Sequence, residues 1–71
     1  MRFSYHAQQQ MARRDIEAAE VGEALDNRET SYAGRPATRM VVLGRTSAGR
    51  RLKVVVAGDV VVTVADRDDE G

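Results

Sequence analysis

The first third of the chain shows hydrophobic residues at helical spacing. Ala7 and Met11 are four residues apart and form a narrow apolar edge, while most positions around them are polar. Ser4 stands directly before this pattern and is a favourable N-cap residue. The spacing therefore predicts a helix over residues 5–14, and Asp15 interrupts the pattern after it.

A second helical pattern follows over residues 17–25. Its apolar positions recur every three or four residues, and its acidic positions lie between them. The inward residues are Ala18, Val21, Ala24 and Leu25, and the outward ones are Glu17, Glu20 and Glu23. The acids cluster toward the start, where they suit the helix dipole, and Asp26-Asn27 ends the pattern.

The period of the pattern becomes two after Pro36. Residues 28–37 contain a glycine and the only proline, so we expect a loop there that includes at most a short strand near Ser31-Tyr32. Gly58-Asp59, between two valine-rich runs, is typical of a tight two-residue hairpin turn. Alternation predicts three strands, over residues 38–44, 51–57 and 60–65.

These elements predict an α+β fold in a single domain over residues 1–71. Two N-terminal helices, a helical pair over 5–25, are expected to pack on a three- to four-stranded antiparallel sheet in the order ααβββ. The antiparallel meander spans 38–65, and an acidic tail spans 66–71. A chain of this length leaves no room for a second core.

Alternation also assigns the strand residues to two faces of the predicted sheet. The face under the helices is expected to carry Leu52, Val54, Val56, Val60, Val62 and Val64. The opposite face is expected to carry Val41, Arg51, Lys53, Val55, Val61 and Thr63. Two small helices cannot cover both faces, so exposed valines indicate a protein partner, a homodimer or a substrate groove. The alternative is that the tail or the 28–37 loop folds over them.

Composition removes several classes of protein. The chain has no cysteine, which excludes thiolate zinc sites and disulfide frameworks. The N-terminal segment lacks the apolar region of a secretory signal. The longest apolar run is cut by Gly58-Asp59 and is too short to span a bilayer. We therefore expect a cytoplasmic protein without a membrane partner.

Charge is distributed unevenly, although it sums to zero. Residues 28–53 carry seven basic residues against Glu29 alone, whereas the segments on either side are net acidic. Six of the seven are arginine, the side chain suited to bidentate phosphate contacts. The basic block is either a phosphate-binding surface or a solvated, arginine-rich hairpin. The neutral total weakens the case for a plain nucleic-acid-binding domain.

A set of motifs across residues 4–65 resembles one bacterial family. These motifs are His6-Ala7, Met11, Arg14, Ile16 and Val21 to Leu25, then Gly49-Arg50, Leu52, Val54 to Val56 and a Val62-Thr63-Val64 strand. The pattern is similar to domain-of-unknown-function family number four-two-five-eight, which looks like a small relative of RelE- and BrnT-type toxins. Asp15 stands where that family usually has glycine, and Glu17 where a Ser or Thr cap is common.

The resemblance implies a metal-independent ribonuclease toxin whose sheet face is masked by an antitoxin. Such cleavage needs a base for the 2′-hydroxyl proton, cations for the transition state and a donor for the leaving oxygen. His6, near a helix N-terminus, suits the base, because the dipole favours a neutral ring. Arg14 and Lys53 suit phosphate binding, and Thr63 suits hydrogen-bond donation. The residues expected along the RNA path are Arg35, Arg39, Arg45, Arg50 and Arg51.

Each of these assignments has an alternative. His6 is equally an ordinary solvated residue of a polar helix face, and Arg14 can bridge to an acid of the second helix such as Glu20. Lys53 and Thr63 can simply populate a solvated sheet face. The residues assemble no nucleotide loop, metal cluster or Ser-His-Asp arrangement, so we expect no cofactor. A non-catalytic module that binds a protein partner through its valine-rich face is the second hypothesis.

Overall fold

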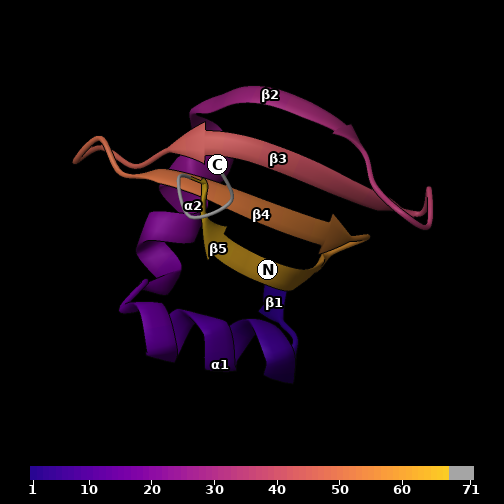
Figure 1. Ribbon diagram of the computed structural model, residues 1–71, viewed down its shortest axis with the longest axis horizontal. Coiled ribbons are helices and arrows are strands. Elements are labelled where there is room, and N and C mark those ends of the chain that lie inside the picture. Colours follow the sequence, from indigo (N-terminus) through magenta and orange to yellow (C-terminus); the bar gives the residue numbers. More distant parts are fainter. Residues whose placement is uncertain (68–71) are drawn as a thin grey trace.

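The computed structural model describes residues 1–67, which form two helices on one side of a five-stranded sheet (Figure 1). The elements are β1 (Arg2–Phe3), α1 (Tyr5–Arg14), α2 (Ala18–Asp26), β2 (Arg28–Ala33), β3 (Arg39–Arg45), β4 (Arg51–Ala57) and β5 (Val60–Asp66). The sheet order is β1-β5-β4-β3-β2, with β1 parallel to β5 and the other neighbours antiparallel. The α+β class and both predicted helices are confirmed.

Two strands lie where the sequence shows no strand pattern. β1 has only two residues, and all six residues of β2 are exposed, so neither strand has a buried side to reveal it. The sheet is therefore five-stranded and mixed, and the prediction of three to four antiparallel strands is wrong in number and in the direction of β1. The three strands of the predicted meander lie within one residue of their expected bounds. The predicted tail begins inside β5, and residues 68–71 lie outside the described part of the chain.

The ends of the helices explain how the chain turns between them. Ser4 Oγ accepts a hydrogen bond from the Ala7 N–H at 3.0 Å, as expected of an N-cap. Asp15 is the C-cap residue of α1, and its φ of 56° and ψ of 51° are left-handed, a conformation that favours glycine. At the start of α2, Glu20 Oε1 accepts from the Glu17 N–H at 3.0 Å.

Neither helix in residues 1–67 has the length and apolar character that crossing a membrane requires.

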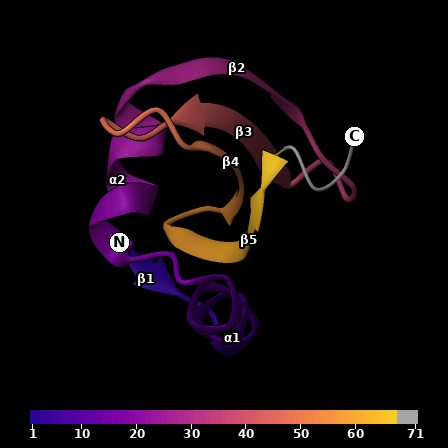
Figure 2. The same cartoon turned by 60° about the vertical axis from the view of Figure 1, so that its left-hand side comes forward.

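Both helices cover the same side of the sheet, which we call the helix face; the other side is the outer face. α1 lies beside β5 and β1, and α2 lies over β3 and β4 (Figure 2). Gly44 permits this close approach, because a Cβ there would come within 2.0 Å of the Ala24 carbonyl oxygen. The core between the layers consists of Ala7, Met11, Ile16, Val21, Ala24, Leu52, Val54, Val61 and Val64.

A bulge in β5 changes which valines reach the core. Val55 pairs with Thr63 and Val56 with Val61, so Val62 is an extra residue with no partner in β4. Val61 is consequently fully buried on the helix face, although alternation predicted it on the outer face. Val60 and Val62, both predicted inward, are only partly buried. The expectation of unbroken alternation through β5 is wrong, because one inserted residue shifts every side chain before it.

Candidate functional site

The outer face carries two of the predicted catalytic residues, Lys53 and Thr63. Leu52 and Val54 are buried on the helix face, so alternation directs Lys53 to the outer face. Lys53 pairs with Ala65 and Thr63 with Val55, which makes Lys53 and Thr63 diagonal neighbours on this face. A long lysine side chain spans such a diagonal, so an ammonium group and a hydroxyl can approach the same phosphate.

The outer face also carries arginines and one aromatic ring among apolar residues. Arg39 and Arg51 lie on it by the registers of β3 and β4, and Arg35 lies in the exposed turn between β2 and β3. Tyr32 pairs with Val41 and remains 50% exposed. An exposed tyrosine beside cations is suited to stacking on an unpaired base while the cations hold phosphates. Val41 and Ala65, which the registers also place on this face, are buried, so this part of the face is covered and exposes less apolar surface than predicted.

Glu29 forms an ion-pair cluster at one end of the outer face. Its Oε1 accepts from Arg67 Nη1 at 2.5 Å, and its Oε2 lies 3.0 Å from Arg45 Nε. Desolvation opposes ionisation of Glu29, but the hydrogen bond from Arg67 and the charges of Arg45, Arg67 and Arg51 outweigh it. The pKa of Glu29 therefore lies below its usual value. Arg45, expected along the RNA path, already has a partner within the protein.

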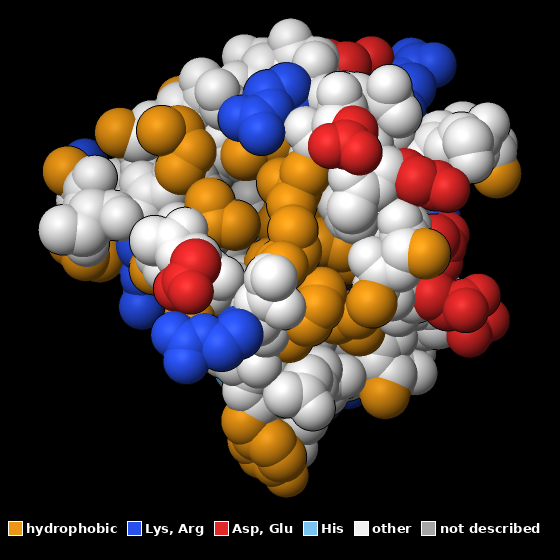
Figure 3. All heavy atoms as spheres, turned by 180° about the vertical axis from the view of Figure 1, so that it is seen from behind, with side chains coloured by type: hydrophobic (Ala, Val, Ile, Leu, Met, Phe, Trp, Pro, Cys, Tyr) orange, Lys and Arg blue, Asp and Glu red, His pale blue; other side chains and the backbone are white. Residues whose placement is uncertain are grey.

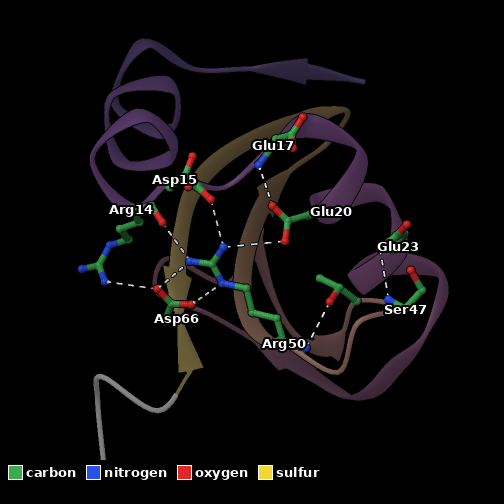
Figure 4. Close-up of polar contacts among 9 residues, drawn as sticks. Arg14, Asp15, Glu17, Glu20, Glu23, Ser47, Arg50 and Asp66 are labelled. Atoms are coloured by element: carbon green, nitrogen blue, oxygen red, sulfur yellow. Dashed lines mark hydrogen bonds and ion pairs between the residues drawn. The ribbon is translucent and has the colours of Figure 1, made fainter.

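Arg50 lies in a polar cluster at the junction of α1, α2 and β5 (Figure 4). Its Nε and Nη2 donate to the Asp66 carboxylate at 2.8 and 3.2 Å. Nη2 also donates to the Arg14 carbonyl at 2.8 Å and Nη1 to the Asp15 carbonyl at 3.0 Å, while Glu20 Oε2 lies 3.6 Å from Nη1.

The hydrogen bond to Asp66 raises the pKa of Arg50 above its usual value. Its guanidinium thus fastens the end of α1 to the end of β5 instead of extending over the outer face. This placement separates Arg50 from the other arginines predicted along the RNA path.

Arg14 is turned toward the same cluster. Its Nη1 lies 3.9 Å from Asp66 Oδ2 on the helix face (Figure 4). The sheet therefore lies between the Arg14–Asp66 pair and the outer-face residues Lys53 and Thr63. As the alternative expected, Arg14 lies near an acid, here Asp66 of β5.

His6 is exposed on α1, at the rim of the sheet. Gln10, one turn later on the same stripe, accepts from the Val64 N–H at 2.9 Å, and Ser4 Oγ donates to the Val62 carbonyl at 3.3 Å. Residues 4–10 therefore run along the free side of β5, with His6 between the two contacts. His6 and Arg14 are about 12 Å apart along the helix axis.

An apolar groove of about 320 Å³, which the sequence did not predict, opens on the helix face. Its lining residues are Met1, Leu25, Arg28, Met40, Val42, Val56, Gly58 and Asp59. Figure 3 shows hydrophobic side chains gathered in the middle of this side of the molecule, with charged side chains around them. The lining comes from several separate segments, so no single sequence pattern reveals it.

Comparison with known proteins identifies the family of this chain but not its function. No curated protein and no solved structure matches the chain significantly. The likeness to RelE- and BrnT-type toxins stays a prediction. Residues 3–66, from the end of β1 to the end of β5, match the model of one family. The chain belongs to this family, DUF4258, a domain of unknown function.

Proposed function

We propose that the protein binds single-stranded RNA on its outer face and cleaves it without a metal ion, as a toxin of toxin–antitoxin type. The observation that carries the proposal is the placement of Arg51, Lys53 and Thr63 on the sheet face opposite the helices. Arg39 lies on the same face toward its other end, opposite Ala57. Phosphate contacts supply most of the affinity in sequence-independent nucleic-acid binding. Local charge on this face therefore matters more than the neutral total.

The proposed chemistry starts with His6 at the rim. His6 takes the proton of a 2′-hydroxyl, whose oxygen attacks the adjacent phosphorus to form a 2′,3′-cyclic phosphate. Lys53 neutralises the charge that develops on the phosphate, and Thr63 donates a hydrogen bond to a non-bridging oxygen. Water returns a proton to the departing 5′ oxygen. Arg14 has no part in this arrangement, because its guanidinium lies against Asp66 on the other face.

A binding measurement tests the outer face. In fluorescence anisotropy with a labelled single-stranded RNA, Arg39→Ala and Lys53→Ala should each weaken binding and reduce the slope of log K against log salt by about one. Arg13→Ala removes an exposed arginine from α1 and serves as the matched control, with unchanged binding expected. Equal affinity of the wild type and the Arg39→Ala/Lys53→Ala double variant contradicts an RNA-binding outer face.

A cleavage assay in the presence of EDTA tests His6. His6→Ala should lower the rate about a hundredfold or more, since a single general base typically contributes that much. Gln9→Ala, an exposed neighbour on α1, should cleave at the wild-type rate. On expression in cells, His6→Ala should no longer arrest growth, whereas Gln9→Ala should still do so. Equal cleavage by His6→Ala and the wild type contradicts the assignment of the base.

A non-catalytic protein-interaction module is the second candidate. The valine-rich outer face expected for it is reduced, since Val61 is in the core and Val41 is buried. The apolar groove on the helix face now supports this candidate instead. A wild-type protein that neither cleaves RNA nor arrests growth places the interaction module ahead of the ribonuclease.

A further inference from the structure

The two edges of the sheet differ in how their backbone groups are satisfied. At the β5 edge, the Asp59 and Val61 carbonyls accept from Arg2 N–H and Ser4 N–H, and Gln10 accepts from the Val64 N–H. At the β2 edge, every residue from Arg28 to Ala33 is exposed, and no element of residues 1–67 lies beyond it in the sheet. An exposed strand edge is a template for pairing with another strand.

The register of β2 identifies which groups point outward. The Gly34 N–H donates to the Arg39 carbonyl at 2.7 Å, and the β2–β3 register is regular from Thr30 to Ala33. Bonded and non-bonded pairs alternate along an antiparallel ladder, so the backbone groups of Thr30 and Tyr32 point toward β3. Those of Ser31 and Ala33 therefore point to the open edge.

We propose that this edge binds β2 of a second copy of the chain in antiparallel orientation. Glu29 lies in the bulge of β2, so Ser31 and Ala33 are the outward residues of its regular part. In one antiparallel register, Ser31 of each copy lies opposite Ala33 of the other copy. The two residues of each pair then exchange both of their backbone hydrogen bonds. The same register sets Tyr32 opposite Tyr32 of the second copy, on the outer face.

The side chains of β2 favour a second copy of the chain, rather than an unrelated strand, as the partner at this edge. Tyr32 is one of the most exposed large hydrophobic residues, and pairing with its own copy covers both rings. Ser31 and Ala33 are small and do not obstruct approach. The assembly joins the two outer faces into one sheet, whether or not RNA binds.

The closed β5 edge limits the assembly to two copies. A molecule with two open edges could pair at both sides and extend into a fibre. Here β1 and the side chains of Ser4 and Gln10 occupy the β5 edge, so the two-fold β2 pair uses the open edge of both copies. The interface is isologous and closes at the dimer.

Engineered cysteines test the register directly, because the natural chain has none. Tyr32→Cys places two thiols on directly opposed residues, with Cα atoms about 4.5 Å apart in a non-bonded pair, and should form an intermolecular disulfide on mild oxidation. Thr30→Cys, two residues away on the same strand and face, puts the thiols about 13 Å apart and should stay reduced. Tyr5→Cys, on exposed α1, measures the background.

Sedimentation velocity up to about 1 mM tests the association itself. The wild type should be a dimer. Ser31→Pro removes an outward N–H without touching the ladder to β3, and should be a folded monomer by circular dichroism. Ala18→Pro, at the first position of α2 where proline is tolerated, is the matched control and should remain a dimer.

Three results overturn the proposal. One is a wild-type monomer at every concentration. Another is a dimer that Ser31→Pro leaves intact while it keeps its fold. The third is cross-linking of Thr30→Cys or Tyr5→Cys as efficient as that of Tyr32→Cys. If Ser31→Pro does not fold, the cysteine comparison decides the question, because neither cysteine alters the backbone.

Discussion

The β5 and β2 edges belong to one sheet but are built in opposite ways. The β5 edge is covered by β1 and α1, and the guanidinium of Arg50 fastens the end of α1 to Asp66 at the end of β5. The β2 edge presents a strand with no buried residue. The covered edge depends on side chains distant in sequence, whereas the open edge depends on the backbone of one hairpin. Substitutions should therefore affect stability at the first edge and association at the second.

The largest effect should come from Arg50→Ala. The substitution leaves Asp66 without its two hydrogen bonds and the Arg14 and Asp15 carbonyls without a donor, so we expect a loss of about 3 kcal/mol in the free energy of unfolding. Arg28→Ala at the open edge removes one exposed bond to the Leu25 carbonyl and should cost less than about 0.5 kcal/mol. Urea denaturation measures both. Similar losses in the two variants contradict the difference between the edges.

A smaller effect is expected for Gln10→Ala. Gln10 Oε1 satisfies the Val64 N–H on the free side of β5, and its removal should cost about 1 kcal/mol. Gln9→Ala changes an exposed neighbour with the same side chain and should leave stability within about 0.5 kcal/mol of the wild type. Faster exchange of the Val64 amide with deuterium in Gln10→Ala alone would locate the effect. Unchanged exchange there shows that the contact does not protect the edge.

Asp15→Gly should stabilise the protein. Asp15 has a φ of 56°, where a Cβ is unfavourable, so glycine should add roughly 0.5 kcal/mol to the free energy of unfolding. Asp26→Gly is the control, because Asp26 is the last residue of α2 and glycine there should be destabilising. Thermal denaturation compares the two. A lower melting temperature for Asp15→Gly indicates that the Asp15 side chain makes a contribution larger than the backbone strain.

The smallest effect concerns Glu29 beside the open edge. Its pKa is lower in the folded protein than the reference 4.5, so its ionised form stabilises the fold above that pH, and the contribution is lost as the pH falls through the folded pKa. Glu29→Gln should therefore lose less stability than the wild type between about pH 5 and about pH 3. Urea midpoints measured at both pH values test this. Parallel pH profiles contradict a role for the Arg45–Glu29–Arg67 cluster.

Elements with a buried side were predictable from the sequence. Apolar spacing located both helices, and alternation located three strands within one residue of their bounds. β2 was missed as a full strand because its ladder consists of backbone bonds, and RETSYA shows no apolar alternation. β1 is too short for any period. The β5 bulge was also not predictable, because the four valines and the threonine at the start of β5 fit either register equally well.

The candidate site was predictable only in part. Lys53 and Thr63 came together on the outer face, since strand alternation alone fixes that relation. The ion-pair partners of Arg14 and Arg50 could not be predicted, because an arginine side chain is long enough to reach any of several acids. Both arginines pair with Asp66, which the sequence pattern had placed in an acidic tail. Which charges pair depends on the twist of the sheet and the angle of α1, and neither is encoded in local spacing.

The parallel pair of β1 and β5 has a consequence for the order of folding. Arg2 pairs with Val60 across nearly the whole chain, whereas β2 to β5 join neighbours through short turns. Closing the longest loop last is the least costly route, so the meander should be formed in the transition state before β1 docks. Phe3→Ala should then accelerate unfolding and leave the refolding rate unchanged. Stopped-flow kinetics would show this, and until β1 docks, the edge that is closed in the folded protein remains open.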